Sequence, residues 1–322
     1  MREPYFVDLH CDTLLAMQQE GRGLDDAAGH INLASLLDAR ALLQCFAAFI
    51  PMNDCAERYS IRETPWEFFQ FLADLFDREM DKYPTQIRPV RTLEDLSKNM
   101  DQGRVSALLT VEDGACIDGR IERVKALYDR GVRLITLTWN YENCIGFPNA
   151  DDPELHAKGL KPFGFEVLAE MEKLGIIVDV SHLSEGGFWD VVRAGTKPFV
   201  ASHSCARPLC GHRRNLTDDQ LRALADRGGV CGVNFYAGFL KTDAVHTENE
   251  DILRHIEHIV KVAGLETAAL GSDFDGIDCT LEMRDYRGLA QLAERIADRL
   301  GSDAADKICR DNALRVFRDV MG

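Results

Sequence analysis

Residues 176–182 read IIVDVSH, and residues 198–203 read PFVASH. Both are short apolar runs that lack the strict alternation of a half-exposed strand. Such runs are typical of parallel strands that are covered on both faces. Each run also ends in a histidine that follows a serine. We therefore expect two parallel strands whose ends carry polar side chains.

The rest of the chain repeats this pattern. Similar runs occur at 6–10 (FVDLH), 41–50, 105–112 (VSALLTVE), 133–138, 229–235 and 268–274. Helical patterns lie between them at 65–83, 121–131, 163–175, 216–229 and 251–264, with a last one from residue 312. Eight strands that alternate with helices predict a (β/α)8 TIM-type barrel, which we expect to form one catalytic domain over residues 1–322. The rival, a doubly wound open sheet, usually has a Gly-rich phosphate turn after its first strand, and HCDTLL is not one.

Composition narrows the class of protein. The net charge of −16 argues against nucleic acid or an anionic membrane as a partner. The N-terminus lacks a signal-peptide pattern, and no run of about 18 apolar residues occurs, so we expect a cytoplasmic protein. The ten cysteines form no CxxC pair and are best interpreted as small buried apolar residues.

Polar side chains follow nearly every predicted strand. In a barrel, the C-terminal ends of all strands face one mouth. Side chains that are far apart in the sequence would therefore meet in one pocket. They are His10, Asp12, Glu112, His182, His203 and Asp273.

This set of residue types favours a metal site. Carboxylates with imidazoles, and no thiolate cluster, suit Zn²⁺ or a similar ion. His10 and Asp12 are two apart on an extended segment and can share one ion. Glu112 would be costly to bury unless it binds something positive. Five ligands exceed the need of one catalytic zinc, whereas two metals that share one carboxylate would use all five.

Other carboxylates are expected to have roles besides metal binding. Asp273 could take a proton from the attacking water and pass it to a leaving amine. We interpret Asp179 as a partner of a ligand or of another core group, and Asp113 as a loop residue or helix cap. We expect Asp275 and Asp278 to be turn or solvent-exposed carboxylates.

Two adjacent arginines, Arg213 and Arg214, lie in CGHRRNLTDDQ (210–220), just before a predicted helix. An arginine near the mouth could bind a carboxylate through two hydrogen bonds. Its position alone fits a surface residue equally well.

Together these motifs identify a resemblance. The set DLHCDT, VEDG, LTLTWN, VDVSH, SHSCARPLCGHRRNLTD, GVNFY and GSDFDG resembles the membrane (renal) dipeptidase family of zinc metallopeptidases, from residue 8 to about 318. The resemblance implies a barrel with two zinc ions that cleaves dipeptides, often with a D-residue at the C-terminal position. A homodimer is also compatible with it.

The resemblance also implies roles for single residues. His10 and Asp12 would bind one ion, His182 and His203 the other, and Glu112 would bridge them. Asp273 would assist proton transfer. Arg214 would hold the C-terminal carboxylate of the substrate, and Tyr236 would be another substrate contact.

One position departs from the family pattern. After LTLT, animal members carry a histidine that contacts the scissile carbonyl, and Trp139 stands there in this chain. The indole N–H can donate one hydrogen bond but cannot accept a proton or bind metal. Bacterial relatives often look like this chain, which we therefore expect to be a bacterial cytoplasmic member.

Two other classes of protein compete with this interpretation. An amidohydrolase-type barrel, such as a deaminase or lactonase, usually begins with HxH and often bridges its metals with a modified lysine on strand four. Here the first strand carries HxD, and Thr138 and Trp139 end the fourth. A non-catalytic binding barrel is the other class, and it would be expected to lose some of the five ligands. Metal analysis with a dipeptide panel would separate the three.

Overall fold

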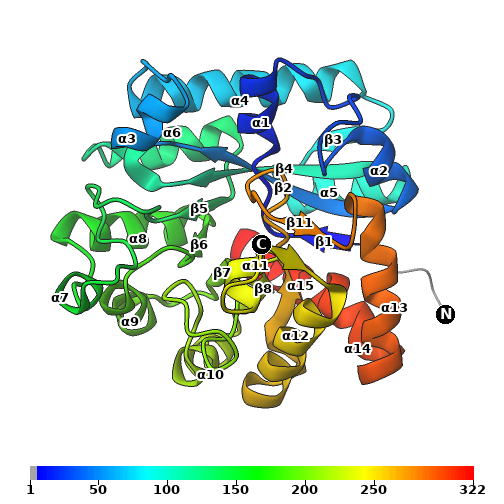
Figure 1. Ribbon diagram of the computed structural model, residues 1–322. Coiled ribbons are helices and arrows are strands. Elements are labelled where there is room, and N and C mark those ends of the chain that lie inside the picture. Colours follow the sequence, from blue (N-terminus) through cyan, green and yellow to red (C-terminus); the bar gives the residue numbers. More distant parts are fainter. Residues whose placement is uncertain (1–5) are drawn as a thin grey trace.

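The computed structural model describes residues 6–322. Its central sheet has nine parallel strands, and the pairing of β2 with β4 closes eight of them into a barrel (Figure 1). All eight predicted strands are confirmed: β1 (Phe6–Asp8), β2 (Ala41–Phe49), β4 (Val105–Glu112), β5 (Leu134–Thr136), β6 (Ile177–Asp179), β7 (Val200–Ser204), β8 (Val230–Val233) and β10 (Ala268–Leu270). The predicted TIM-type fold is therefore confirmed.

The six predicted helices are also present. They are α4 (Pro65–Lys82), α6 (Glu122–Arg130), α8 (Pro162–Leu174), α10 (Asp218–Asp226), α12 (Asn249–Ala263) and α15 (Asn312–Met321). Local sequence fixes their ends. The Thr217 side chain accepts a hydrogen bond from Gln220 N and caps α10. Gly131 ends α6 with a φ of 111°, which a residue with a side chain rarely adopts.

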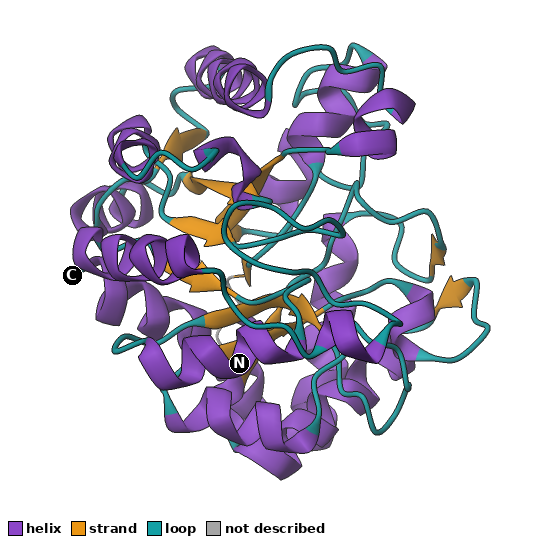
Figure 2. Cartoon of the chain, turned by 90° about the vertical axis from the view of Figure 1, so that its left-hand side faces the viewer, coloured by secondary structure: helices purple, strands orange, loops and turns teal. Residues whose placement is uncertain are grey.

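Further short elements fill the connections. The additional helices are α1 (Thr13–Glu20), α2 (Leu33–Asp38), α3 (Asn53–Arg58), α5 (Leu93–Asp101), α7 (Pro153–His156), α9 (Glu185–Ala194), α11 (Ala237–Leu240), α13 (Leu289–Leu300) and α14 (Ser302–Asp306). Strand β3 (Ile87–Pro89) pairs with the start of β4. Strands β9 (His246–Thr247) and β11 (Thr280–Leu281) form a separate small sheet, which stands apart from the barrel in Figure 2.

The barrel interior is apolar at its N-terminal end. One buried cluster takes side chains from all eight barrel strands, among them Val7, Leu134 and Ile177. Leu314 and Phe317 of α15 pack against this cluster. The C-terminal helix therefore closes the end of the barrel at which the strands begin. The polar residues of the predicted site lie at the opposite end.

Two expectations from composition can be compared with this structure. All ten cysteines are free, and only Cys144 and Cys279 are not fully buried, as expected for small apolar residues. Within residues 6–322, no helix combines the length and the apolar content that a membrane crossing requires.

Candidate active site

Glu112 lies at the centre of a cluster of histidines at the C-terminal end of the barrel. It is the last residue of β4, and its two carboxylate oxygens face different partners. Oε2 is 3.5 Å from His10 Nε2. Oε1 is 3.1 Å from His182 Nε2 and 3.4 Å from His203 Nε2. The strand ends therefore bring together side chains that are up to 193 positions apart in the sequence, from residue 10 to residue 203.

Two more carboxylates complete the cluster on the side of His10. Asp12 Oδ2 is 3.4 Å from His10 Nε2, and Asp273 Oδ1 is 3.8 Å from the same nitrogen. Two overlapping groups have the mutual distances expected of metal ligands. One is His10, Glu112 and His203, and the other is His10, Asp12 and Asp273.

Buried atoms without hydrogen bonds support a cation at this place. Both ring nitrogens of His10 and Oδ1 of Asp12 are buried and make no hydrogen bond to any residue that the structure describes. Such groups are costly to bury unless something else binds them. Nitrogen and carboxylate donors together fit a divalent first-row ion such as Zn²⁺. The residues therefore fit the metal that the resemblance implies.

The pKa values of Glu112, His182 and His203 also support a cation at this place. Burial by itself would raise the pKa of Glu112, but the charge of His10 and the close approach of the three histidine rings lower this pKa well below its ordinary value. Burial lowers the pKa of His182 to about 3, and it lowers that of His203 well below the usual range. Glu112 is thus an anion, and His182 and His203 are neutral at pH 7, the states that metal ligation needs. Burial by itself would lower the pKa of His10, but Glu112 and Asp12 raise it above its ordinary value.

The backbone at His182 has an uncommon conformation that aims the side chain into the cluster. Its φ is 66°, in the left-handed region that residues with side chains seldom adopt. Three donors hold the His182 carbonyl: the backbone N–H of Asn149 at 2.7 Å, its Nδ2 at 2.9 Å and Thr138 Oγ1 at 3.4 Å. Strain of this kind persists only where the surroundings enforce it, and it concentrates at functional sites.

Asp273 is the carboxylate of the cluster that is most open to the mouth. Its side chain is 14% exposed, compared with 4% for Glu112 and 9% for Asp12. Asn234 Nδ2 donates a hydrogen bond to its Oδ2 at 2.8 Å. Burial and the charges of Asp12 and Glu112 raise the pKa of Asp273 to about 8, against the opposing charge of His10. Asp273 can therefore hold or release a proton near neutral pH, although a bound cation would lower this pKa.

The structure separates the two arginines that the sequence left as alternatives. Arg214 is 5% exposed, and it donates to His203 O at 3.0 Å and to Ser204 Oγ at 3.2 Å. Its Nε is buried and has no hydrogen-bond partner among residues 6–322. Arg213 instead pairs with Asp151 at 2.7 Å at the surface. Arg214 is thus the arginine that lies beside the cluster.

The remaining predicted contacts also lie at strand ends. Trp139 follows β5, and its ring is 5.9 Å from the ring of His182 and 4.8 Å from that of Phe49. Tyr236 precedes α11 and packs edge-on against Phe239 at 4.9 Å. Both rings are partly exposed, so they border the mouth and are not part of the cluster.

Asp275 stands in a turn, which is one of the two alternatives that the sequence left open. Asp275 is not solvated: its side chain is 4% exposed and accepts hydrogen bonds from Thr13 Oγ1 and His30 N, each at 2.7 Å. It also pairs with Arg22 at 3.3 Å. Asp278 is exposed, as expected. Asp113 accepts a hydrogen bond from Ala115 N and caps the short helix that follows, which agrees with its interpretation as a cap.

Sequence reasoning missed several residues that support the cluster. Asn140 Oδ1 is 3.0 Å from His182 Nδ1, and Ser202 Oγ is 2.7 Å from His203 Nδ1. The serine before each histidine was a visible signal, but no local pattern pointed to Asn140 or Asn234. Asp179 bonds to Ser202, so it is paired in the core as one reading of the sequence had it.

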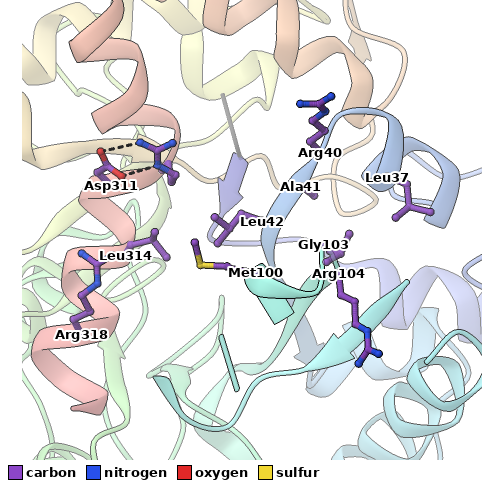
Figure 3. Close-up of a pocket in the computed structure, with 12 residues that line it drawn as sticks. Leu37, Arg40, Ala41, Leu42, Met100, Gly103, Arg104, Asp311, Leu314 and Arg318 are labelled. Atoms are coloured by element: carbon purple, nitrogen blue, oxygen red, sulfur yellow. Dashed lines mark hydrogen bonds and ion pairs between the residues drawn. The ribbon is translucent and has the colours of Figure 1, made fainter. Parts of the chain in front are cut away.

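A separate cavity lies away from the histidine cluster. It has a volume of about 820 Å³ and is lined by Ala41 and Val105, which begin β2 and β4, and by Leu314 of α15. Figure 3 shows Leu42, Met100 and Leu314 around it. It therefore lies at the end of the barrel opposite the histidine cluster, and we assign it no part in the chemistry.

A family model matches this chain over residues 1–321, and its description is membrane dipeptidase, peptidase family M19. An uncharacterized protein of Klebsiella pneumoniae is 36% identical over 245 residues, which are 73% of this chain and 89% of that protein. An uncharacterized dipeptidase of Schizosaccharomyces pombe is 34% identical over 254 residues, which are 77% of this chain but only 61% of the yeast protein.

Solved structures share the fold. A dipeptidase described as a metallopeptidase of family M19 has a TM-score of 0.88 at 24% identity, with both chains covered completely. A metallopeptidase from Rhodobacter sphaeroides, solved with a phosphinate mimic of the dipeptide L-Ala-D-Ala, has a TM-score of 0.87 at 23% identity, with 99% of each chain covered.

Proposed function

This chain belongs to the membrane dipeptidase family of metallopeptidases. On that premise we propose that it hydrolyses dipeptides with two divalent metal ions, and that these ions are zinc. The observation that carries the proposal is the position of Glu112. One of its oxygens faces His10, and the other faces His182 and His203. A carboxylate placed in this way is suited to bridge two ions.

The ligand roles follow from the two sides of Glu112. His10 and Asp12 would hold one ion, and His182 and His203 would hold the other. Two ions held there would supply Lewis-acid chemistry, because they acidify water and polarise a carbonyl. The protein's own contribution is a rigid set of ligand atoms, since each ligand lies at the end of a strand of the closed barrel or just after it.

Asp273 would carry the proton. Hydrolysis of a peptide bond needs a proton on the leaving nitrogen, because an unprotonated amide nitrogen is a poor leaving group. The histidines of the cluster face Glu112 and are committed to metal in this proposal. Asp273 has one oxygen held by Asn234 and the other beside His10, and it is the most exposed carboxylate of the cluster. It can therefore take a proton at the cluster and release it toward the mouth.

Arg214 would bind the free carboxylate of the dipeptide. A buried guanidinium with unused donors favours an anion, and two hydrogen bonds already fix its direction. One of these bonds goes to the carbonyl of His203, so one residue links the metal cluster to the carboxylate site. This fixed spacing would favour short substrates with a free C-terminus. Tyr236 and Trp139 would line the mouth around the substrate.

The test is a hydrolysis panel on the purified full-length chain with zinc supplied. It compares L-Xaa-L-Xaa dipeptides, L-Xaa-D-Xaa dipeptides, C-terminally amidated dipeptides, and deaminase and lactone substrates. We expect hydrolysis of dipeptides, with loss of activity on chelation and recovery on adding zinc. Turnover of a deaminase or lactone substrate with none of any dipeptide would overturn the proposal in favour of another amidohydrolase-type activity. Light scattering on the same sample tests the homodimer.

A further inference from the structure

The carboxylate of Asp179 lies beneath the histidine cluster and is saturated with hydrogen bonds. Asp179 is the last residue of β6 and is fully buried. Its Oδ1 accepts from Ser181 N at 3.0 Å and Ser202 N at 2.8 Å. Its Oδ2 accepts from Ser202 Oγ and from Thr136 Oγ1, each at 2.6 Å. Four donors make this group a fixed anchor between three neighbouring strands.

Ser202 connects this anchor to a histidine of the cluster. Its Oγ lies 2.6 Å from Asp179 Oδ2 and 2.7 Å from His203 Nδ1. A hydroxyl has one hydrogen, and a carboxylate oxygen has none to offer. The hydrogen of Ser202 must therefore lie toward Asp179, because two bare oxygens at 2.6 Å would repel each other. Ser202 is then only an acceptor toward His203.

This settles which nitrogen of His203 carries the hydrogen. A neutral imidazole has one N–H, and a Ser202 oxygen that only accepts requires it on Nδ1. The Nε2 atom is left with its lone pair, and Nε2 is the atom that lies 3.4 Å from Glu112 Oε1 and 3.0 Å from His182 Nε2. The chain of hydrogen bonds thus turns the lone pair of His203 Nε2, which can bind a metal ion, toward the centre of the cluster.

We infer that Ser202, anchored by Asp179, is a positioning residue that holds His203 in the Nδ1–H tautomer and so sets the affinity of the metal site formed with His182. That this site holds a metal rests on the proposed function, whereas the tautomer of His203 rests on the hydrogen bonds alone. The second histidine is held less firmly, because its partner, Asn140, is a neutral and exposed residue at 3.0 Å.

The chain offers a matched control for the test. Thr136 Oγ1 donates to the same Asp179 oxygen at the same 2.6 Å as Ser202 Oγ, and both residues are 0% exposed. Ser202→Ala and Thr136→Val therefore each remove one buried hydrogen bond to Asp179. Only Ser202→Ala removes the partner of His203. A purely structural role of the network would affect both variants alike.

Two measurements on the full-length chain decide the question. Zinc affinity, measured by competition with a chelator, should fall about 10- to 100-fold in Ser202→Ala, the usual effect of losing a hydrogen-bond partner of a ligand. In Thr136→Val it should change by less than about threefold, because no ligand loses its partner. Nitrogen-15 NMR of the histidine rings should show the Nδ1–H of His203 as a slowly exchanging proton in the parent and in Thr136→Val, and as a fast-exchanging one in Ser202→Ala.

Each outcome has one meaning. Equal zinc affinities in the two variants, or an Nε2–H tautomer of His203 in the chelator-treated parent, would overturn the inference. If the parent binds no zinc but His203 has the protected Nδ1–H, the tautomer is correct and the proposed function fails instead. Thermal unfolding of both variants identifies a fold defect, which would appear as a matched loss of stability.

Discussion

Asn234 donates a hydrogen bond from Nδ2 to Asp273 Oδ2 at 2.8 Å, while Oδ1 of the same carboxylate lies 3.8 Å from His10 Nε2. The two oxygens of Asp273 therefore have separate partners. One is fixed by a neutral amide, and the other is turned to the cluster. An asparagine at this position could keep the bond to Asn234 through its oxygen, but it would turn an NH2 group to His10.

This relationship predicts the effect of Asp273→Asn. The variant keeps the shape and one hydrogen bond but cannot carry a proton, so kcat on a dipeptide should fall by about 100-fold or more. Metal content should stay near that of the parent. Asp278→Asn, an exposed change in the same loop, is the control. If Asp273→Asn holds its metals and keeps kcat within about threefold of the parent, Asp273 is not the proton carrier.

A second prediction separates the adjacent arginines. Arg214→Met should lower kcat/KM on dipeptides by roughly 10- to 150-fold, which corresponds to roughly 1.5–3 kcal/mol for a lost hydrogen bond to a charged group. Amidated dipeptides should be affected far less, because they lack the carboxylate. Arg213→Met should leave both rates near those of the parent, since Arg213 pairs with Asp151 at the surface. An equal loss on free and amidated substrates would make Arg214 a structural residue.

Much of the fold could be predicted because strands and long helices have clear patterns. The eight apolar runs became the eight barrel strands, and Thr217 and Gly131 mark ends of helices that lie in the predicted ranges 216–229 and 121–131. Nine helices of residues 6–322 were not predicted, and α1 is one of them. The apolar residues of α1, Leu14 to Met17, are consecutive in the sequence and therefore lack helical spacing. Strands β9 and β11 have two residues each, too few to form a pattern.

The site residues could be predicted where a polar residue ends an apolar run, as at His10, Glu112 and His203. Partners that come from distant loops carry no such signal. Asp275 illustrates the limit: its sequence neighbours suggest a turn, yet its contacts are with Thr13, Arg22 and His30, about 250 positions away. A buried ion pair of this kind depends on tertiary packing, which no local window contains.

A third prediction concerns metal content. The purified parent should hold about two divalent ions per chain, because Glu112 faces histidines on both sides. His182→Ala should lose one of them and nearly all activity. His258→Ala is a suitable control, since His258 bonds to Asp218 and is no part of the cluster. A parent that is fully active with one ion or none, measured by elemental analysis, would contradict the bridged pair.

The last prediction concerns stability and uses the buried carboxylate of Asp275. This side chain joins the loop after β10 to α1 and to the segment that holds Arg22 and His30. The side chain of Arg22 is itself 3% exposed, and among residues 6–322 it keeps only its ion pair with Glu20 when Asp275 is removed. Breaking a buried pair by removing one partner costs about 3–5 kcal/mol. Asp275→Ala should therefore lower the free energy of unfolding in urea by about 3 kcal/mol at neutral pH, while Asp278→Ala should change it little.

The dependence of this effect on pH has a definite sign. Burial alone would raise the pKa of Asp275, but the hydrogen bonds from His30 and Thr13 and the charge of Arg22 lower it. A carboxyl group with a lowered pKa in the folded state stabilises the fold above its unfolded pKa of about 3.9 and loses that contribution as the pH falls through the folded pKa. The difference in unfolding free energy between parent and Asp275→Ala should thus be full at pH 7 and shrink below about pH 4. A difference that grows on acidification would mean that the Asp275 carboxylate does not stabilise the fold through these contacts.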